Sequence, residues 1–217
     1  MLKVIIFDMD GVLVNSTKYI WESFNILLKD SGIQFSNKEI KKYLGLSLKD
    51  KLRLWKRDYG INEFNLEDFS RKAGEIELNL MKKDLKLNEN INSLIKEAKS
   101  KGIKLAVATS SLRWRAEKIL DLLKIKEKFD IIITAEDVIN HKPSPDIFLK
   151  VANKLNENPK NCLVFEDAKN GIEAAKKGNM KVVAIKTEYY SEEDLKNADL
   201  IINDFSEVNI QKLKILF

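Results

Sequence analysis

Val4-Ile5-Ile6-Phe7-Asp8-Met9-Asp10-Gly11-Val12, near the start of the chain, is the stretch from which the fold can be predicted. Four apolar residues with high strand propensity run directly into a carboxylate, and a second carboxylate and a glycine follow. A continuous apolar run that ends in turn residues predicts a buried strand of a parallel sheet. Asp8 then lies at the carboxyl end of this strand, where open α/β sheets bind their ligands.

The two carboxylates that end this stretch, Asp8 and Asp10, have two interpretations. Gly11 favours a turn of the backbone that lets both side chains enter one small site. Because two acids held so close repel each other, such a site needs a cation or a shared proton. The alternative is that the Asp-x-Asp sequence only forms the turn that ends the strand, and its spacing does not exclude this.

The composition bounds the class of protein. The chain has 217 residues, of which 44% are hydrophobic and 33% are charged, as expected for a soluble globular domain with or without an insert. No apolar run approaches the roughly 18 residues of a membrane helix, and the first residues do not resemble a signal peptide. The single cysteine, Cys162, excludes an internal disulfide. We therefore expect a cytoplasmic protein.

The net charge of +5 restricts the classes of partner. Lysines scattered among Glu and Asp are typical of a solvated surface, and no basic cluster with interleaved aromatic residues occurs. We therefore expect neither a nucleic acid nor a membrane as partner. A mild positive charge suits an enzyme that acts on small anions. Monomer and homodimer both remain open.

Residues 16–86 are expected to form a helical segment inserted after the first strand. Apolar residues spaced three and four apart predict a helix over 18–29, and Ser36 followed by Glu39 predicts the capping box of another. A helical module of about 70 residues has a marginal core unless it packs against another part. The predicted domains are a core of residues 1–15 and 87–217 and a helical domain of residues 16–86.

From residue 90 onward, helical patterns alternate with short apolar runs. Strands are predicted at 105–108, 131–134, 162–165, 182–185 and 200–202. Pro145 is expected at the first position of the helix before the fourth strand. Strands that alternate with helices in this way form βαβ units. The predicted fold class is therefore α/β, a doubly wound, Rossmann-like parallel sheet with an inserted all-α domain.

Polar residues gather at the ends of the predicted strands. They are Asp8 and Asp10 after the first strand, Thr109, Ser110 and Ser111 after the second, Lys142 before the fourth, and Glu166 and Asp167 after it. These side chains should converge at one edge of the sheet. Four carboxylates without Cys or His partners suit Mg²⁺, whereas hydroxyls, helix amides and a lysine suit a phosphate. Together they predict phosphoryl transfer.

Each of these residues also has an interpretation without chemistry. Thr109 and Asp167 can cap the helices that follow them, and Lys142 can be an exposed loop residue. Any one of these explanations is credible, but the whole set in this order is not.

The same residues resemble the motifs of the haloacid dehalogenase-like phosphohydrolase superfamily. The branch it resembles has a helical cap after the first motif and includes the β-phosphoglucomutase-like and phosphoglycolate-phosphatase-like members. The matching motifs are Phe7-Asp8-Met9-Asp10-Gly11-Val12-Leu13, Thr109 after Ala106-Val107-Ala108, Lys142-Pro143-Ser144-Pro145-Asp146, and Phe165-Glu166-Asp167-Ala168-Lys169-Asn170-Gly171-Ile172. The resemblance covers essentially the whole chain.

This resemblance implies a role for each core residue. Asp8 is the nucleophile that forms an aspartyl-phosphate, and Asp10 is the general acid and base. The implied Mg²⁺ ligands are Asp8, the carbonyl oxygen of Asp10, Asp167 and Glu166. The implied phosphate ligands are Thr109, Ser110 and Lys142.

The helical cap is implied to be a lid that excludes water and reads the leaving group. Ser16 and Lys49, the latter in the loop 45–49, are the candidate substrate contacts from the cap. Counted from the first motif, the cap histidine of the β-phosphoglucomutases falls on Ile20, and their cap arginine falls at or near Leu48. The side chain of Ile20 cannot form hydrogen bonds. Lys49, next to Leu48, lacks the bidentate fork of an arginine.

The leading prediction is a Mg²⁺-dependent phosphatase for a small phosphorylated metabolite, such as a sugar phosphate or a phosphoglycolate-like compound. A phosphosugar mutase that uses the same aspartyl-phosphate is the first alternative. A catalytically silent binding module is the second, although Asp8, Asp10, Lys142 and Asp167 are all present.

Overall fold

The computed structural model describes residues 1–44, 46, 48–61 and 65–217. Two compact units make up the chain: Met1–Asn15 with Lys86–Phe217, and Ser16–Leu85. Lys86, which the sequence analysis assigned to the inserted segment, thus belongs to the first unit. Gly45 and Ser47 of the loop 45–49 lie outside the described residues.

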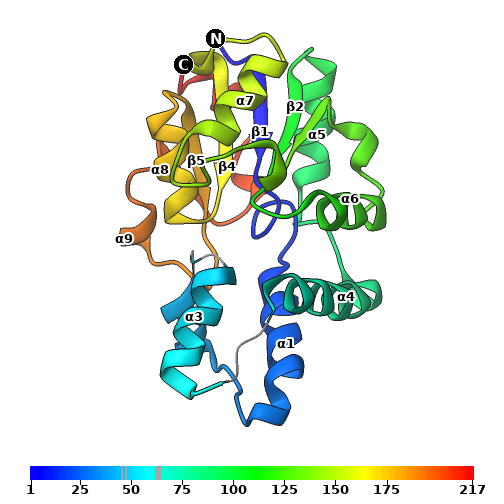
Figure 1. Ribbon diagram of the computed structural model, residues 1–217. Helices are drawn as coiled ribbons and strands as arrows, with labels where there is room; N and C mark the ends of the chain where they lie inside the picture. The colour runs from blue at the N-terminus through cyan, green and yellow to red at the C-terminus, as the bar shows by residue number, and fades with distance from the viewer. Residues whose placement is uncertain (45, 47, 62–64) are drawn as a thin grey trace. The chain divides into compact units, whose positions relative to one another are not determined.

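The first unit is built on a six-stranded parallel sheet (Figure 1). Its strands are β1 (Val4–Phe7), β2 (Lys104–Ala108), β3 (Ile131–Ile133), β4 (Cys162–Glu166), β5 (Lys181–Ile185) and β6 (Leu200–Ile202). They are ordered β3-β2-β1-β4-β5-β6, so successive strands are added to one side of β1 and then to the other. The carboxyl ends beside β1 therefore form the topological switch point, where such sheets bind ligands.

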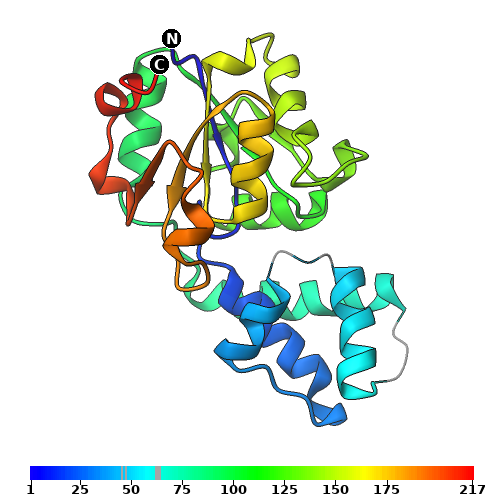
Figure 2. The ribbon, with the colours of Figure 1, turned by 90° about the vertical axis from the view of Figure 1, so that its left-hand side faces the viewer.

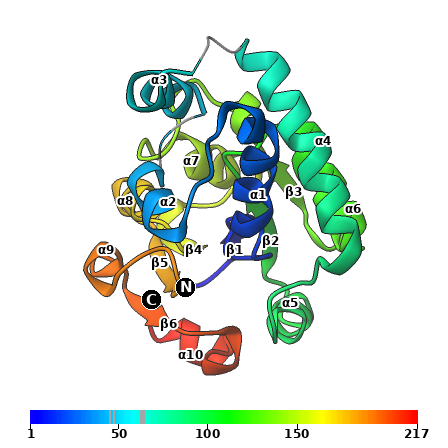
Figure 3. The same cartoon turned by 90° about the horizontal axis from the view of Figure 1, so that it is seen from below.

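Helices cover both faces of this sheet. They are α5 (Ile91–Ser100), α6 (Arg113–Leu122), α7 (Asp146–Lys154), α8 (Lys169–Lys177), α9 (Glu192–Leu195) and α10 (Ile210–Lys214), with 3₁₀ turns η2 (Lys126–Lys128), η3 (Ala135–Asp137), η4 (Pro159–Asn161) and η5 (Phe205–Glu207). Figure 3 shows α7 and α8 on one face and α5 and α10 on the other. Both chain ends lie near the amino-terminal ends of the strands, away from the switch point (Figure 2).

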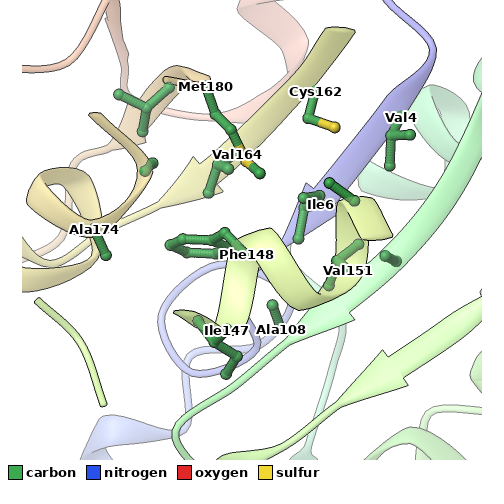
Figure 4. Close-up of a cluster of buried hydrophobic side chains, with 14 of the residues drawn as sticks. Val4, Ile6, Ala108, Ile147, Phe148, Val151, Cys162, Val164, Ala174 and Met180 are labelled. Carbon is green, nitrogen blue, oxygen red and sulfur yellow. The ribbon is translucent and has the colours of Figure 1, made fainter. Parts of the chain in front are cut away.

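A buried apolar cluster joins α7 and α8 to the sheet (Figure 4). Ile6 of β1 and Val164 of β4 contribute to it, and Phe148 of α7 is fully buried among them. Phe7 and Phe165, one residue further along the same strands, belong to the opposite face, where their rings stack at 5.2 Å between centroids. Both faces of the central strands are thus buried, which explains their continuous apolar sequences.

The second unit is a small bundle of helices. Its elements are α1 (Thr17–Leu28), the 3₁₀ turn η1 (Lys29–Ser31), α2 (Asn37–Tyr43), α3 (Leu48–Tyr59) and α4 (Leu66–Asp84). Trp55 has no exposed surface, and the rings of Phe35 and Phe24 lie 4.7 and 5.4 Å from it. The capping box of Ser36 and Glu39 forms as the sequence indicated. Aromatic packing therefore supplies the core of this unit.

The predicted fold class is confirmed, with one local correction. Pro145 was expected at the first position of α7, but it is the N-cap residue and the helix begins at Asp146. Its φ of −75° and ψ of −4° are close to helical values, so the difference is one residue at a helix boundary. Among the described residues, no helix combines the length and the apolar character that crossing a membrane requires.

Candidate active site

Parallel pairing of β1 with β4 places Asp8 beside Glu166. Phe7 is in register with Phe165, and the backbone N–H of Asp8 donates to the carbonyl oxygen of Phe165 at 3.0 Å. Glu166 is the last residue of β4, so the two carboxylates end neighbouring strands at the switch point. Asp8 and Glu166 are both buried. Two buried acids side by side require a cation nearby.

Lys142 supplies that cation. Its Nζ atom lies 2.6 Å from Oδ1 of Asp8 and 2.6 Å from Oε1 of Glu166, and its side chain is only 8% exposed. Burial disfavours the ammonium, but the two carboxylates outweigh burial and raise the pKa of Lys142 above its ordinary value. Lys142 therefore stays positively charged throughout the physiological pH range.

The hydrogen bonds of Glu166 occupy both of its carboxylate oxygens. Oε1 accepts from Lys142, and Oε2 accepts from the backbone N–H groups of Asp167 and Ala168, each at 2.9 Å. Gly171 makes room for this carboxylate, since a Cβ atom there would lie 1.8 Å from Oε1. These contacts show that Glu166 holds Lys142 and the start of α8, and its part as a metal ligand stays a prediction.

Asp167 contributes a third buried carboxylate. It lies against Gly11, where a Cβ atom would come within 2.1 Å of Oδ2, and Gly11 has a φ of +90°. Within the described ranges, no donor bonds to the carboxylate of Asp167. Burial, followed by the charges of Glu166 and Asp8, raises its pKa well above the ordinary value. Burial is also the main reason why the pKa of Asp8 is raised to about 7.

Asp10 is held by Ser111, one of the polar residues that were expected at this edge of the sheet, and by Arg115, which the sequence analysis did not place in the site. Arg115 forms a bidentate ion pair with Asp10, with Nη2–Oδ1 and Nη1–Oδ2 distances of 2.8 and 2.9 Å. The hydroxyl of Ser111 donates to Oδ2 at 2.8 Å and accepts a bond from Arg115. For Arg115, the one signal in the sequence is its position four residues after Ser111, a spacing typical of residues that lie near each other along a helix.

The predicted phosphate ligands differ in their surroundings. Thr109 is buried beyond the end of β2, and its hydroxyl oxygen accepts the backbone N–H of Ser111 at 3.1 Å. Ser110 is exposed. Ser16 and Lys49 lie in the second unit, the former buried and the latter exposed, so their substrate contacts stay a prediction.

The buried carboxylates also bear on the predicted metal. Within the described ranges, no three His, Cys, Asp or Glu side chains are grouped closely enough to hold a metal ion. Asp8 and Asp167 nevertheless bring two buried oxygen-donor side chains, and their raised pKa values show that their ionised forms lack full compensation, which chemically suits a hard cation such as Mg²⁺.

Residues 5–185 match the sequence profile of the haloacid dehalogenase-like hydrolases. The chain belongs to this family. A curated relative from Thermotoga maritima, named phosphorylated carbohydrates phosphatase, is 31% identical over 180 residues, which are 83% of each chain. The predicted membership of the family is therefore confirmed.

Two solved structures extend this comparison. CbbY from Rhodobacter sphaeroides, crystallised in complex with phosphate, has a TM-score of 0.89 at 27% identity and covers 99% of this chain and 100% of its own. A structure from Clostridium difficile, named β-phosphoglucomutase, has a TM-score of 0.85 at 28% identity over 100% of this chain and 97% of its own. The chain is thus a hydrolase of this family, and relatives named as phosphatases support a phosphoric monoester hydrolase.

Proposed function

We propose that this protein is a Mg²⁺-dependent phosphatase that hydrolyses a small phosphorylated metabolite through an aspartyl-phosphate on Asp8. The observation that carries the proposal is the position of Asp8 at the switch point, next to Lys142 and two residues before Asp10. A relative named for phosphorylated carbohydrates makes a sugar phosphate the first substrate class to test, and a phosphoglycolate-like compound the second.

Asp8 and Asp10 divide the reaction between them. In the first step, a carboxylate oxygen of Asp8 bonds to phosphorus while the bond from phosphorus to the leaving oxygen breaks, and Asp10 gives its proton to that oxygen. In the second step, Asp10 takes a proton from water. The water oxygen bonds to phosphorus while the bond to Asp8 breaks, which releases inorganic phosphate and regenerates both carboxyl groups.

Lys142 and Thr109 are suited to bind the phosphoryl oxygens. The ammonium of Lys142 already touches Asp8, so it lies beside any group that Asp8 attacks. Thr109 is positioned by its backbone N–H, which donates to the carbonyl oxygen of Ile133 at 3.0 Å. A buried cation and a fixed hydroxyl stabilise the charge that spreads over the phosphoryl oxygens in the transition state.

Asp8 and Asp167 are the carboxylates that would hold Mg²⁺, together with the carbonyl oxygen of Asp10. When bound, Mg²⁺ neutralises the repulsion between the carboxylates and an incoming phosphate. Lys142 alone cannot do so, because Asp8, Glu166 and Asp167 already exceed its single positive charge. We assign the choice of leaving group to the second unit, residues 16–85, as a cap.

A phosphosugar mutase is the second candidate, because a structure named β-phosphoglucomutase covers the whole chain at a TM-score of 0.85. A mutase must keep water away from the aspartyl-phosphate until the sugar phosphate returns to attack it. Counted from the first motif, the mutase cap histidine falls on Ile20, whose side chain cannot form a hydrogen bond. The mutase cap arginine falls at or near Leu48, next to Lys49, and a lysine lacks the bidentate fork of an arginine. The phosphatase is therefore the better supported of the two.

A screen of the purified protein against phosphorylated metabolites in the presence of Mg²⁺ tests the proposal. We expect release of inorganic phosphate from at least one sugar phosphate or phosphoglycolate-like compound, and none from the Asp8→Asn variant. Phosphorus NMR of β-glucose 1-phosphate with a bisphosphate primer separates the two candidates. Accumulation of glucose 6-phosphate with little free phosphate would establish the mutase instead.

A further inference from the structure

Arg115 is a buried cation in an unfavourable place. It is the third residue of α6, and its side chain is only 10% exposed. The amino-terminal turn of a helix carries partial positive charge, which disfavours a cation there. Burying a guanidinium costs further free energy unless a partner compensates for the lost hydration. Neither helix formation nor burial therefore explains an arginine at this position.

Asp10 compensates the buried charge of Arg115. Both carboxylate oxygens of Asp10 accept from the guanidinium, and Oδ2 also accepts from Ser111. Because Arg115 is planar and binds with two parallel hydrogen bonds, it sets the plane of the carboxylate as well as its position. Ser111 in turn accepts a bond from Arg115, so the three side chains restrain one another.

We propose that Arg115 is a positioning residue that sets the orientation of the Asp10 carboxylate for proton transfer. The inference rests on the proposed function of Asp10 and adds a residue outside the family motifs that the sequence analysis identified. All three side chains belong to the first unit. Arg115 acts through Asp10, and it neither attacks phosphorus nor transfers the proton itself.

The first test compares Arg115→Met with Arg113→Met. Arg113 is a neighbouring arginine of the same helix, but it is 40% exposed and pairs with Asp137 instead of Asp10. We expect Arg115→Met to lower kcat by about 10- to 100-fold, with KM changed less than threefold, because misplacing a reacting group by about 1 Å can cost 10²-fold in rate. Arg113→Met should keep kcat within twofold. Equal kcat values for both variants would overturn the proposal.

Arg115→Lys keeps the charge but loses the bidentate fork. We expect its kcat to lie between those of the wild type and Arg115→Met, with a normal circular dichroism spectrum. This variant also serves as the test if Arg115→Met does not fold. Wild-type kcat in Arg115→Lys would mean that the fork does not orient Asp10, and would overturn the proposal.

A double-mutant cycle separates positioning from general structural support. If Arg115 acts through Asp10, adding Arg115→Met to Asp10→Ala should change the residual kcat less than twofold. If Arg115 only supports the fold, it should slow Asp10→Ala as much as it slows the wild type.

The same four proteins give a readout that does not depend on activity. Asp10→Ala leaves Arg115 buried without this carboxylate, so adding Arg115→Met should lower the midpoint of thermal unfolding less than it does in the wild type. Losses of midpoint that simply add would show that the pair is uncoupled and would overturn the proposal. If the cycle is coupled but no phosphate ester is hydrolysed, the proposed function fails while the contact stands.

Discussion

Nζ of Lys142 lies 2.6 Å from Oδ1 of Asp8 in a site where both side chains are almost fully buried. The same ammonium binds Glu166, whose other oxygen accepts two backbone N–H groups at the start of α8. The start of α8 therefore fixes the carboxylate of Glu166, Glu166 fixes the ammonium of Lys142, and Lys142 contacts Asp8. Residues from three separate segments of the chain are held together by one buried charge.

Asp8→Asn should abolish turnover while the protein stays folded. An amide keeps the shape of the side chain but is a poor nucleophile and loses its negative charge. Loss of the covalent step should slow phosphate release by about 10³-fold or more. Phosphate release is measured with the best substrate of the screen, and circular dichroism checks the fold. Near-normal activity would exclude Asp8 as the nucleophile.

Lys142→Met should lower both activity and stability. The substitution leaves Asp8 and Glu166 buried without their shared cation, which typically costs 3–5 kcal/mol for a broken buried pair, so a loss of about that size is expected in urea unfolding. Activity should fall by about 10²-fold or more, because the positive charge proposed to stabilise the phosphoryl oxygens is lost. Lys160→Met, at an exposed lysine, is the control and should change neither quantity.

Gly171→Ala tests whether the position of the Glu166 carboxylate beside α8 matters for the active site. The added Cβ atom would lie 1.8 Å from Oε1 of Glu166, so this carboxylate must move away from Lys142. We expect activity to fall at least tenfold. Gly178→Ala at the end of the same helix places its Cβ 3.4 Å or more from its nearest neighbours and is the matched control. Equal activity of the two variants would contradict the role of Glu166.

The raised pKa of Asp8 predicts a pH-dependent difference between the metal-free wild type and Asp8→Asn. A buried acid with a pKa raised from 3.8 to about 7 binds more protons when folded, so its contribution to stability falls as pH rises from about 4 to about 7. As pH rises over this range, the free energy of unfolding of Asp8→Asn minus that of the wild type should increase by a few kcal/mol. This follows from about 1.4 kcal/mol for each unit of the pKa shift. Urea unfolding in EDTA measures the difference, and a constant difference would refute the prediction.

Chelation should remove activity reversibly. The raised pKa values of Asp8 and Asp167 show that Lys142 does not fully compensate their ionised forms, so ionisation of the site and phosphate binding should depend on a divalent cation. We expect no phosphate release in EDTA and full recovery with excess Mg²⁺, whereas Ca²⁺ should inhibit because it prefers more ligands at longer distances. Full activity after exhaustive chelation would falsify the metal requirement.

Local sequence determined much of this protein. The apolar run before Asp8 specifies a buried parallel strand, and the alternation of strands with helices after residue 90 specifies the α/β class. Strand ends alone were enough to bring Asp8, Glu166 and Asp167 to one edge, because parallel strands share a direction. The capping box of Ser36 and Glu39 was equally readable, since its two partners are three residues apart.

Only the tertiary structure showed which side chains of the site contact one another. The sequence did not show that the oxygens of Glu166 bind Lys142 and two backbone N–H groups, which gives this residue a role in holding Lys142 and the start of α8. Arg115 was not singled out from the sequence, because its partner Asp10 is 105 positions away. Periodicity and capping are set by neighbours along the chain, whereas a buried ion pair depends on which distant segments the sheet brings together.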